Sequence, residues 1–259
     1  MAPRSSAAYG AAIRAAARDA TKYVTRTAAA KDDVTRVGFG SGRAATAVAR
    51  EIAGLVRDKG LRVIGVPTSL QIKLVIEEEV GDAIPLIGAD QTDMVDIVYD
   101  GADQIDASGY VVKGGGGALL RENILFNMAQ RVVVMADATK FVRNISRTVP
   151  VEAHRLARRL VQRRITEMGG EPVLRVQDSG YPVFTENGNV ILDCGFGTIR
   201  DPGRLTGAIR RIPGVAESGI FARRPDVIYK AGRRGKFREI RTRSGRADAY
   251  GERDPDLRT

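Results

Sequence analysis

The sequence predicts an α/β protein with a doubly wound, mainly parallel, Rossmann-like sheet and a second, smaller α+β domain inserted before the last strand. Over the first 145 residues, short apolar stretches alternate with longer helix-forming stretches, which is the pattern of repeated β-α units. Residues 131–136 are nearly all apolar, as expected for a strand buried on both faces of a sheet. Polar, glycine-rich clusters follow the apolar stretches, and ligands bind at that end of the strands in open α/β sheets.

Local composition predicts the elements of the larger domain. Residues 6–30 are rich in alanine and contain no glycine after Gly10, which favours a helix. Gly40-Ser41-Gly42 and Pro67-Thr68-Ser69 each separate a strand-like stretch from a helix-like one. The expected helices cover residues 6–30, 44–59, 70–80 and 118–129, and the expected strands cover residues 34–39, 62–66, 84–88, 94–99, 110–113 and 131–136.

The pattern changes after Asn144 and predicts the smaller domain. Asn187-Gly188 between two strand-like stretches is a strong hairpin signal. Residues 226–229 are expected to return to the first sheet as its last strand, and the polar, basic segment that follows is expected to be a disordered tail. In this domain we expect strands at 149–151, 172–176, 189–194 and 214–221 and helices at 152–168 and 203–211; the predicted domain limits are 1–145 plus 220–232, 146–219, and the tail 233–259.

Composition narrows the classes of function. The 259 residues are 43% apolar, which suffices for a packed core, and no run of about 18 apolar residues predicts a membrane span. The N-terminal residues lack the apolar region of a signal peptide. Cys194 is the only cysteine and His154 the only histidine, so neither an internal disulfide nor a typical zinc site is expected. We therefore expect a cytoplasmic protein with no metal.

The net charge of +10 raises the question of a nucleic-acid partner. Many of the basic residues lie in two segments, residues 155–164 and the segment after Gly232. The pattern of residues 155–164 is typical of the solvent-exposed face of a helix. The chain has no Trp and is only 5% aromatic, so the stacking platforms of RNA-binding proteins are missing. A basic field that attracts anionic sugar phosphates explains the sign of the charge equally well, and a nucleic-acid partner is the less favoured reading.

The segment from residue 100 to residue 122 contains most of the candidate catalytic residues. It holds Asp100 and Asp103, then Lys113 before four glycines, and Glu122 at the start of a predicted helix. Moving a proton between adjacent carbons of a sugar needs a carboxylate base and groups that stabilise an enediolate. Each residue also has a simpler reading: the aspartates as turn formers, and Glu122 as a first-turn acid that pairs with Arg121. Four glycines beside a lysine favour a ligand that touches the backbone.

The loop Gly40-Ser41-Gly42 joins a predicted strand to a predicted helix. Backbone N–H groups at such a helix start bind phosphate, and Arg43 would add a charge; the alternative is a tight turn that simply requires glycine. The loop is neither a full dinucleotide fingerprint nor a Walker loop. Lys140 follows another strand at the same edge, as a ligand contact or as a surface lysine.

These residues resemble type A ribose-5-phosphate isomerase. The resemblance extends from about residue 8 to residue 232, and the segments that carry it occur in order along the chain. They are Gly65-Val66-Pro67-Thr68-Ser69, Asp100-Gly101-Ala102-Asp103, Lys113-Gly114-Gly115-Gly116-Gly117-Ala118 with Arg121-Glu122, Ala136-Asp137-Ala138-Thr139-Lys140, Val149-Pro150-Val151-Glu152, Asn187-Gly188-Asn189, and Gly214-Val215 with Gly219-Ile220-Phe221.

The resemblance implies an enzyme of the pentose phosphate pathway that interconverts ribose 5-phosphate and ribulose 5-phosphate without a cofactor, as a cytoplasmic homodimer or homotetramer. It implies that Glu122 is the proton-transferring base, that Asp100 assists ring opening, and that Asp103 and Lys113 hold the hydroxyls and the enediolate. It further implies that Lys140 contacts the substrate and that the glycines after Lys113 supply backbone contacts. With the phosphate loop and the Gly101-Ala102 turn included, we expect the substrate-binding residues to be Ser41, Gly42, Arg43, Ala44, Gly101, Ala102, Gly114, Gly115, Gly116 and Lys140.

One departure concerns the phosphate loop. The family usually reads Gly-Thr-Gly-Ser-Thr, whereas this chain reads Gly40-Ser41-Gly42-Arg43-Ala44, so two hydroxyl groups are absent and a cation is added. The departure bears on phosphate affinity and substrate choice. Together with the basic tail it motivates an alternative function, a non-catalytic sugar-phosphate-binding regulator on the same fold.

Overall fold

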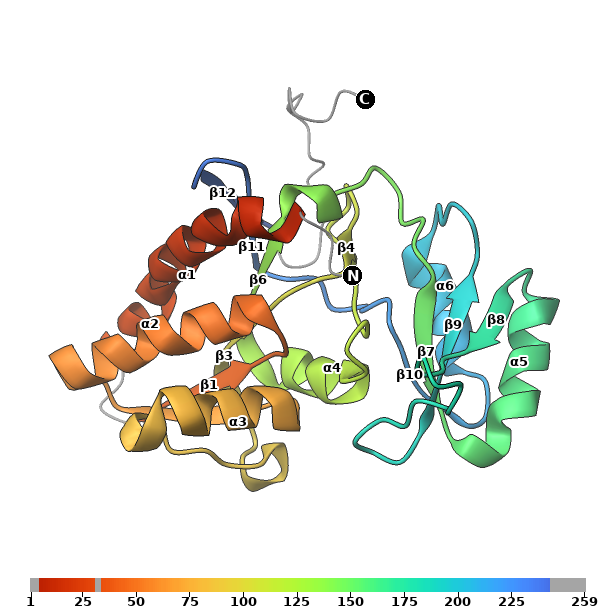
Figure 1. The fold of residues 1–259 in the computed structure, drawn as a ribbon, viewed down its shortest axis with the longest axis horizontal. Helices are drawn as coiled ribbons and strands as arrows, with labels where there is room; N and C mark the ends of the chain where they lie inside the picture. The colour runs from red at the N-terminus through yellow and green to blue at the C-terminus, as the bar shows by residue number, and fades with distance from the viewer. Residues whose placement is uncertain (1–4, 31–33, 243–259) are drawn as a thin grey trace.

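The larger domain of this computed structural model, which describes residues 5–30 and 34–242, is built on a six-stranded sheet (Figure 1). The strand order is β12-β11-β6-β3-β1-β2, and every neighbouring pair is parallel except β11 and β12. The strands are β1 (Thr35–Phe39), β2 (Val63–Pro67), β3 (Val95–Asp100), β6 (Ala129–Asp137), β11 (Val227–Ala231) and β12 (Phe237–Arg241).

Helices cover both faces of this sheet. One core cluster joins α1, α2 and α3 to side chains of β1, β3, β6 and β11, and a second joins α4 to other side chains of β3, β6 and β11. Because successive residues of a strand point to opposite faces, the predicted doubly wound architecture is confirmed. The helices are α1 (Ser5–Ala29), α2 (Arg43–Lys59), α3 (Leu70–Glu79) and α4 (Leu119–Met128).

The smaller domain is a four-stranded antiparallel sheet, β10-β7-β9-β8, inserted between β6 and β11 (Figure 1). Val151, Leu192 and Cys194 of this sheet pack against Val161 and Ile209 of its two helices. We propose that the domain limits lie near residues 145 and 220, as the sequence predicts. The elements are β7 (Val149–Ala153), β8 (Glu171–Leu174), β9 (Val190–Gly195), β10 (Val215–Ser218), α5 (Arg158–Glu167) and α6 (Pro202–Arg210), and the short pair β4 (Gln104–Ile105) and β5 (Val111–Val112) lies beside α4.

Three predicted elements differ in the structure. The helix expected at 152–168 begins only at Arg158, because β7 continues to Ala153 and His154 then accepts the Leu156 N–H at the start of a 3₁₀ turn. The strand expected at 84–88 is reduced to a single bridge between Gly65 and Leu86. The strand expected at 214–221 covers only residues 215–218.

The prediction of a disordered tail from residue 233 is wrong for residues 237–241, which form β12. Glu239 of β12 accepts hydrogen bonds from Tyr23, at 2.7 Å, and from Lys22, both on α1. Lys22 also contacts Asp19 at 2.7 Å, and Asp19 accepts the Tyr229 hydroxyl of β11 at 2.7 Å. This polar network attaches the charged strand to the sheet, and local composition gave no sign of it. Residues 243–259 of the predicted tail lie outside the described residues.

Within the described ranges, no helix combines the length and the apolar character needed to span a membrane.

Replacing Glu239 with Gln tests the network. Burial raises the pKa of Glu239, but hydrogen bonds from Lys22 and Tyr23 outweigh it and lower the value to about 2. The unfolded value is about 4.3, so the stabilisation is present above that pH and is lost as the pH falls toward 2. We expect Glu239→Gln to lower the free energy of unfolding by about 1–3 kcal/mol at pH 7 and to flatten its acid dependence, measured by urea unfolding.

Glu167→Gln is the matched control, because Glu167 makes exposed ion pairs with Arg163 and Arg164 on α5. Such pairs contribute about 0–1 kcal/mol. Equal effects of the two substitutions at every pH would contradict a structural role of the Glu239 network.

Candidate active site

The site lies where the topology of the sheet reverses. β1 stands between β2 and β3, and the chain goes from β1 to β2 on one side, whereas β3 is followed by β6 on the other. In open α/β sheets, ligands bind at the carboxyl ends of the strands at such a point. The loop after β1 starts with Gly40, whose N–H donates to the Tyr99 carbonyl of β3 at 2.9 Å. The two predicted clusters, at residues 40–44 and 100–103, therefore lie side by side.

Lys113 connects the two predicted catalytic carboxylates. Its Nζ lies 2.9 Å from Asp100 Oδ1 and 3.2 Å from Glu122 Oε1, and it donates to the Gly101 carbonyl at 2.8 Å. Asp100 ends β3, Lys113 follows β5, and Glu122 lies in the first turn of α4. All three side chains are at least 94% buried. Asp100 Oδ2 and Glu122 Oε2 are buried without a hydrogen-bond partner among the described residues, so each carboxylate has one oxygen that no protein group binds.

Burial controls the protonation of these groups. Burial and the neighbouring charge of Asp100 raise the pKa of Glu122 to about 8, although Lys113 opposes the shift. Burial also raises the pKa of Asp100 above its ordinary value. Burial alone would lower the pKa of Lys113, but the attraction of Asp100 and Glu122 outweighs it, so the net shift is upward. The lysine stays charged, and both carboxyl groups hold a proton to a higher pH than they would in water.

Asp103 and the glycines after Lys113 form the wall of the site. Asp103 Oδ2 accepts the Gly115 N–H at 2.8 Å, and a Cβ at residue 115 would lie only 2.8 Å from Asp103 Oδ1. Gly114 and Gly117 have φ values of +99° and +86°, which favour glycine. Gly115 and Gly116 are exposed, so their backbone is open to a small molecule. The structure thus brings Asp103 and these glycines to the same edge as Lys113.

The predicted phosphate loop is surrounded by hydroxyl groups from the neighbouring strand. Ser41 Oγ lies 2.8 Å from Ser69 Oγ and 3.2 Å from Thr68 Oγ1, and the Gly42 N–H donates to Gln71 at 3.0 Å. Thr68 and Ser69 follow β2, the strand beside β1. Thr68, Ser69 and Gln71 are not among the site residues predicted from the sequence. Their signal was available, because polar residues after adjacent parallel strands meet at one edge.

The remaining predicted binding residues follow β1, β3 and β6 at the same edge of the sheet. Arg43 is the first residue of α2, is exposed, and has no ion-pair partner among the described residues. Ala44 is buried beneath it. Ala102 lies in the loop between Asp100 and Asp103, and Lys140 ends the 3₁₀ turn that follows β6. No hydrogen bond or ion pair in the described part of the chain links Lys140 to Lys113 or its carboxylates.

The smaller domain reaches over the site through its hairpin. Arg121 does not pair with Glu122, as the simpler reading of the sequence has it; it binds Glu186, at 2.5 Å, and Asn187, at 2.9 Å, in the hairpin turn. Glu186 also accepts the N–H of Leu70 at the start of α3, at 2.8 Å. One carboxylate therefore connects α3 to α4. The turn is held in place by Glu152 of β7, a buried residue that accepts hydrogen bonds from Thr185, Asn187 and Asn189 at 2.8–3.0 Å.

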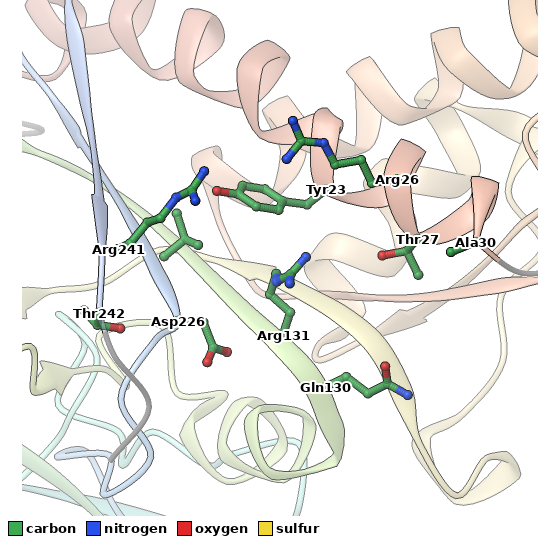
Figure 2. A pocket seen from close by; sticks show the side chains of 10 residues that line it. Tyr23, Arg26, Thr27, Ala30, Gln130, Arg131, Asp226, Arg241 and Thr242 are labelled. Atoms are coloured by element: carbon green, nitrogen blue, oxygen red, sulfur yellow. The ribbon is translucent and has the colours of Figure 1, made fainter. Parts of the chain in front are cut away.

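A cavity of about 660 Å³ lies at the opposite edge of the sheet, near the start of β6 (Figure 2). Arg26, Arg131 and Arg241 line it, and the Arg131 guanidinium lies 5.1 Å from the centre of the Tyr23 ring. Asp226 is the carboxylate that lines this cavity, and it accepts the Val132 N–H at 2.7 Å. The cavity lacks a lysine beside two free carboxylates, so we do not place proton transfer there. In the described ranges, no group of three or more His, Cys, Asp and Glu side chains is placed to hold a metal ion.

The fold and the buried lysine between two carboxylates are those of an α/β isomerase that works by proton transfer at a small anionic ligand. The family described as ribose 5-phosphate isomerase A (phosphoriboisomerase A) matches residues 64–235. Ribose-5-phosphate isomerase A of Haloarcula marismortui is 42% identical over 214 residues, which are 82% of this chain and 91% of that protein. The chain belongs to the ribose 5-phosphate isomerase A family.

Solved structures agree with this assignment. The isomerase of Methanocaldococcus jannaschii superposes with a TM-score of 0.78 at 33% identity, over 90% of this chain and 98% of the other. A D-ribose-5-phosphate isomerase in complex with phospho-erythronic acid gives 0.80 at 30% identity, over 89% and 97% of the two chains.

Replacing Gly40 with Ala tests how closely the phosphate loop approaches the buried carboxylate. A Cβ at residue 40 would lie 1.9 Å from Asp100 Cγ. We expect the displaced carboxylate to lose its contact with Lys113, with kcat reduced at least about 100-fold and stability lowered by about 1–3 kcal/mol. Gly54→Ala on α2 is the control, because its Cβ would meet no heavy atom within 4 Å. A Gly40→Ala enzyme with the wild-type kcat would show that the loop moves freely away from Asp100.

Proposed function

We propose that this chain interconverts ribose 5-phosphate and ribulose 5-phosphate through an enediolate. The observation that carries the proposal is the pair of buried oxygens without a hydrogen-bond partner, Asp100 Oδ2 and Glu122 Oε2, on the two carboxylates that contact the charged Lys113. Family membership supports the substrate. The direct test is conversion of ribose 5-phosphate by the purified protein, with and without a chelator; no conversion in either case would overturn the proposal.

Glu122 is the base of the proposed mechanism. Its carboxylate removes the proton from C2 of the open-chain aldose, and the C2–H electron pair forms the C1–C2 double bond while the carbonyl electrons move to O1. The same carboxyl group then returns the proton to C1, and the hydroxyl proton passes from O2 to O1. A pKa of about 8 suits the task, because a base is most effective when its pKa lies near the working pH.

Lys113 and Asp100 assist from the same cluster. The Lys113 ammonium supplies the positive charge that an oxyanion needs, in a site where little water screens it. Asp100 keeps one oxygen free to exchange a proton with a sugar hydroxyl, which both ring opening and the O2-to-O1 proton transfer require. Asp103 orients the Gly115 N–H, and Gly101, Ala102 and the glycine loop supply backbone contacts to the sugar.

The 5-phosphate is proposed to bind between the start of α2 and the turn after β2. Backbone N–H groups at a helix start attract phosphate, and Ser41, Thr68 and Ser69 supply hydroxyl donors beside them. Arg43 stands at the same helix start and has no other anionic partner in the described structure. Lys140, at the same edge of the sheet, is proposed as a further contact.

The alternative, a regulator that binds a sugar phosphate without reacting, has no support from the comparisons. A binding protein gains nothing from a base whose pKa is raised by burial and by a second carboxylate, because that arrangement lowers stability. The complete set of Glu122, Lys113 and Asp100 therefore favours the enzyme.

We further propose a homodimer or homotetramer in the cytoplasm. β8 is an edge strand of its sheet within the described residues, and four apolar side chains on it and on the following hairpin are exposed, namely Val173, Val176, Tyr181 and Phe184. A second copy of the chain would cover them. Cys194 is buried and unpaired, which suits a reducing compartment.

Replacing Glu122 with Gln tests the base. The amide keeps the shape of the carboxylate but cannot accept the C2 proton, so we expect turnover to fall by about two to four orders of magnitude or below detection. The fold should be intact by circular dichroism. Glu77→Gln on the surface of α3 is the control and should leave turnover unchanged. Full activity of Glu122→Gln would remove Glu122 from this role.

The pH dependence gives a separate test of the same base. Only ionised Glu122 accepts the proton, so kcat/KM of the wild type should rise with pH and level off above the pKa of about 8. Asp100→Asn removes the neighbouring charge that helps raise this pKa. The pH at which the residual kcat/KM of this variant reaches half of its maximum should therefore be lower than in the wild type. An unshifted profile in Asp100→Asn would mean that another group controls the acid limb.

Replacing Arg43 with Ala tests whether the guanidinium compensates for the missing loop hydroxyls. Loss of a charged hydrogen bond of about 1.5–3 kcal/mol should raise KM for ribose 5-phosphate by one to two orders of magnitude. Stability should change little, because Arg43 is exposed. Arg57→Ala, at the other end of α2, is the control. An unchanged KM would show that backbone N–H groups and hydroxyls suffice.

A further inference from the structure

Arg175 of the smaller domain extends into the glycine loop of the larger one. It lies directly after β8, and its side chain is only 17% exposed. Nη1 donates to the Gly114 carbonyl at 2.7 Å and to the Gly115 carbonyl at 3.2 Å. Nε and Nη2 donate to the two oxygens of Asp193 on β9, at 2.8 and 2.5 Å. The guanidinium is thus fixed to its own sheet on one side and holds two successive carbonyls on the other.

Peptide planarity then fixes where the N–H groups of the loop point. In a trans peptide group the C=O and the N–H point in opposite directions. The Gly114 carbonyl and the Gly115 N–H belong to one peptide group, and while the carbonyl binds Arg175, the N–H binds Asp103 at 2.8 Å. The Gly115 carbonyl and the Gly116 N–H belong to the next group, so the Gly116 N–H also points away from Arg175.

The Gly116 N–H is available to a ligand. None of the described residues accepts a hydrogen bond from it, and Gly116 is exposed. The neighbouring N–H groups are occupied, that of Gly115 by Asp103 and that of Gly117 by the Gly114 carbonyl, so the Gly116 N–H is the donor of this turn that an anionic ligand can bind. The positive charge of Arg175 on the two carbonyls also polarises their peptide groups, which makes the N–H groups stronger donors.

We propose that Arg175, held by Asp193, is a positioning residue for the isomerisation: it keeps the Gly115 N–H on Asp103 and turns the Gly116 N–H toward the reacting end of the sugar, where the Gly116 N–H stabilises the oxygen that becomes negative in the enediolate. The inference rests on the proposed function above. Donors that are already oriented before the reaction stabilise the transition state more than the bound sugar. Arg175 itself touches neither the substrate nor Glu122.

The geometry requires a guanidinium. Arg175 uses two nitrogens on Asp193 and a third on the carbonyls, in one planar fork. A lysine has a single nitrogen and cannot hold both sides in this geometry. Arg175→Lys should therefore keep the positive charge but no longer hold the N–H groups of the glycine loop in their orientation.

The test compares Arg175→Ala, Arg175→Lys and Asp193→Asn with the wild type. Arg164→Ala is the control, because Arg164 makes only an exposed ion pair with Glu167 on α5. The measurements are kcat and KM for ribose 5-phosphate, the Kd for phospho-erythronic acid, whose carboxylate resembles the enediolate, and the melting temperature. The activity of Arg175→Ala is also measured with added guanidinium chloride at low, non-denaturing concentration.

We expect Arg175→Ala to lower kcat about 10- to 100-fold and to raise the Kd for phospho-erythronic acid by a similar factor, while KM for ribose 5-phosphate changes less than about threefold. Arg175→Lys and Asp193→Asn should show smaller losses of the same kind, and guanidinium should restore part of the kcat of Arg175→Ala.

A purely structural contact between the domains would give a different result. It would lower the melting temperature and the active fraction, leave the kcat of the folded fraction and the affinity for phospho-erythronic acid unchanged, and show no rescue; that result overturns the proposal. If Arg175→Ala does not fold, the kcat, the Kd for phospho-erythronic acid and the melting temperature of Asp193→Asn and Arg175→Lys distinguish the two explanations in the same way. A wild type that does not isomerise ribose 5-phosphate would instead refute the proposed function.

Discussion

The contact of Lys113 with two buried carboxylates is the constraint on which the rest of the site depends. A single buried charge costs several kcal/mol, and Lys113, Asp100 and Glu122 are tolerated only because each faces an opposite charge. Two carboxylates and one ammonium still leave an excess negative charge, and burial raises the pKa of both acids, that of Glu122 to about 8. A carboxyl group that gains and loses a proton easily in a dry site is what an enediolate reaction requires.

The close packing around this group explains several glycines better than chain flexibility does. At residue 40 a Cβ would overlap the Asp100 carboxylate, so the phosphate loop touches the charged group through its backbone alone. At residue 219, where the chain leaves the smaller domain, a Cβ would lie 2.6 Å from the Lys113 carbonyl. Gly219 also accepts the Lys113 N–H at 2.8 Å. The lysine is therefore fixed at its backbone by the connection between the domains and at its tip by the acids.

Local patterns could predict the sheet, its doubly wound order and the buried group, because all of these depend on composition and on chemistry within short segments. Residues 100–122 supply all three members of the group, so one segment sufficed. Features that depend on distant partners were missed. β12 is highly charged and becomes a strand through Glu239 and its contacts on α1, more than 200 residues away. Likewise, Arg121 stands beside Glu122 in the sequence but pairs with Glu186 of the hairpin.

The two domains contribute different parts of the site. The side chains of the acid–base group come wholly from the larger domain, whereas Gly219, at the end of the smaller domain, holds the backbone of Lys113. The smaller domain contributes Glu186, which connects the starts of α3 and α4, and Arg175, which holds the glycine loop. A small displacement of the smaller domain would therefore change both the orientation of the glycine loop and the position of the Lys113 backbone. The inserted domain thus orients groups around the acids, while the acids themselves belong to the larger domain.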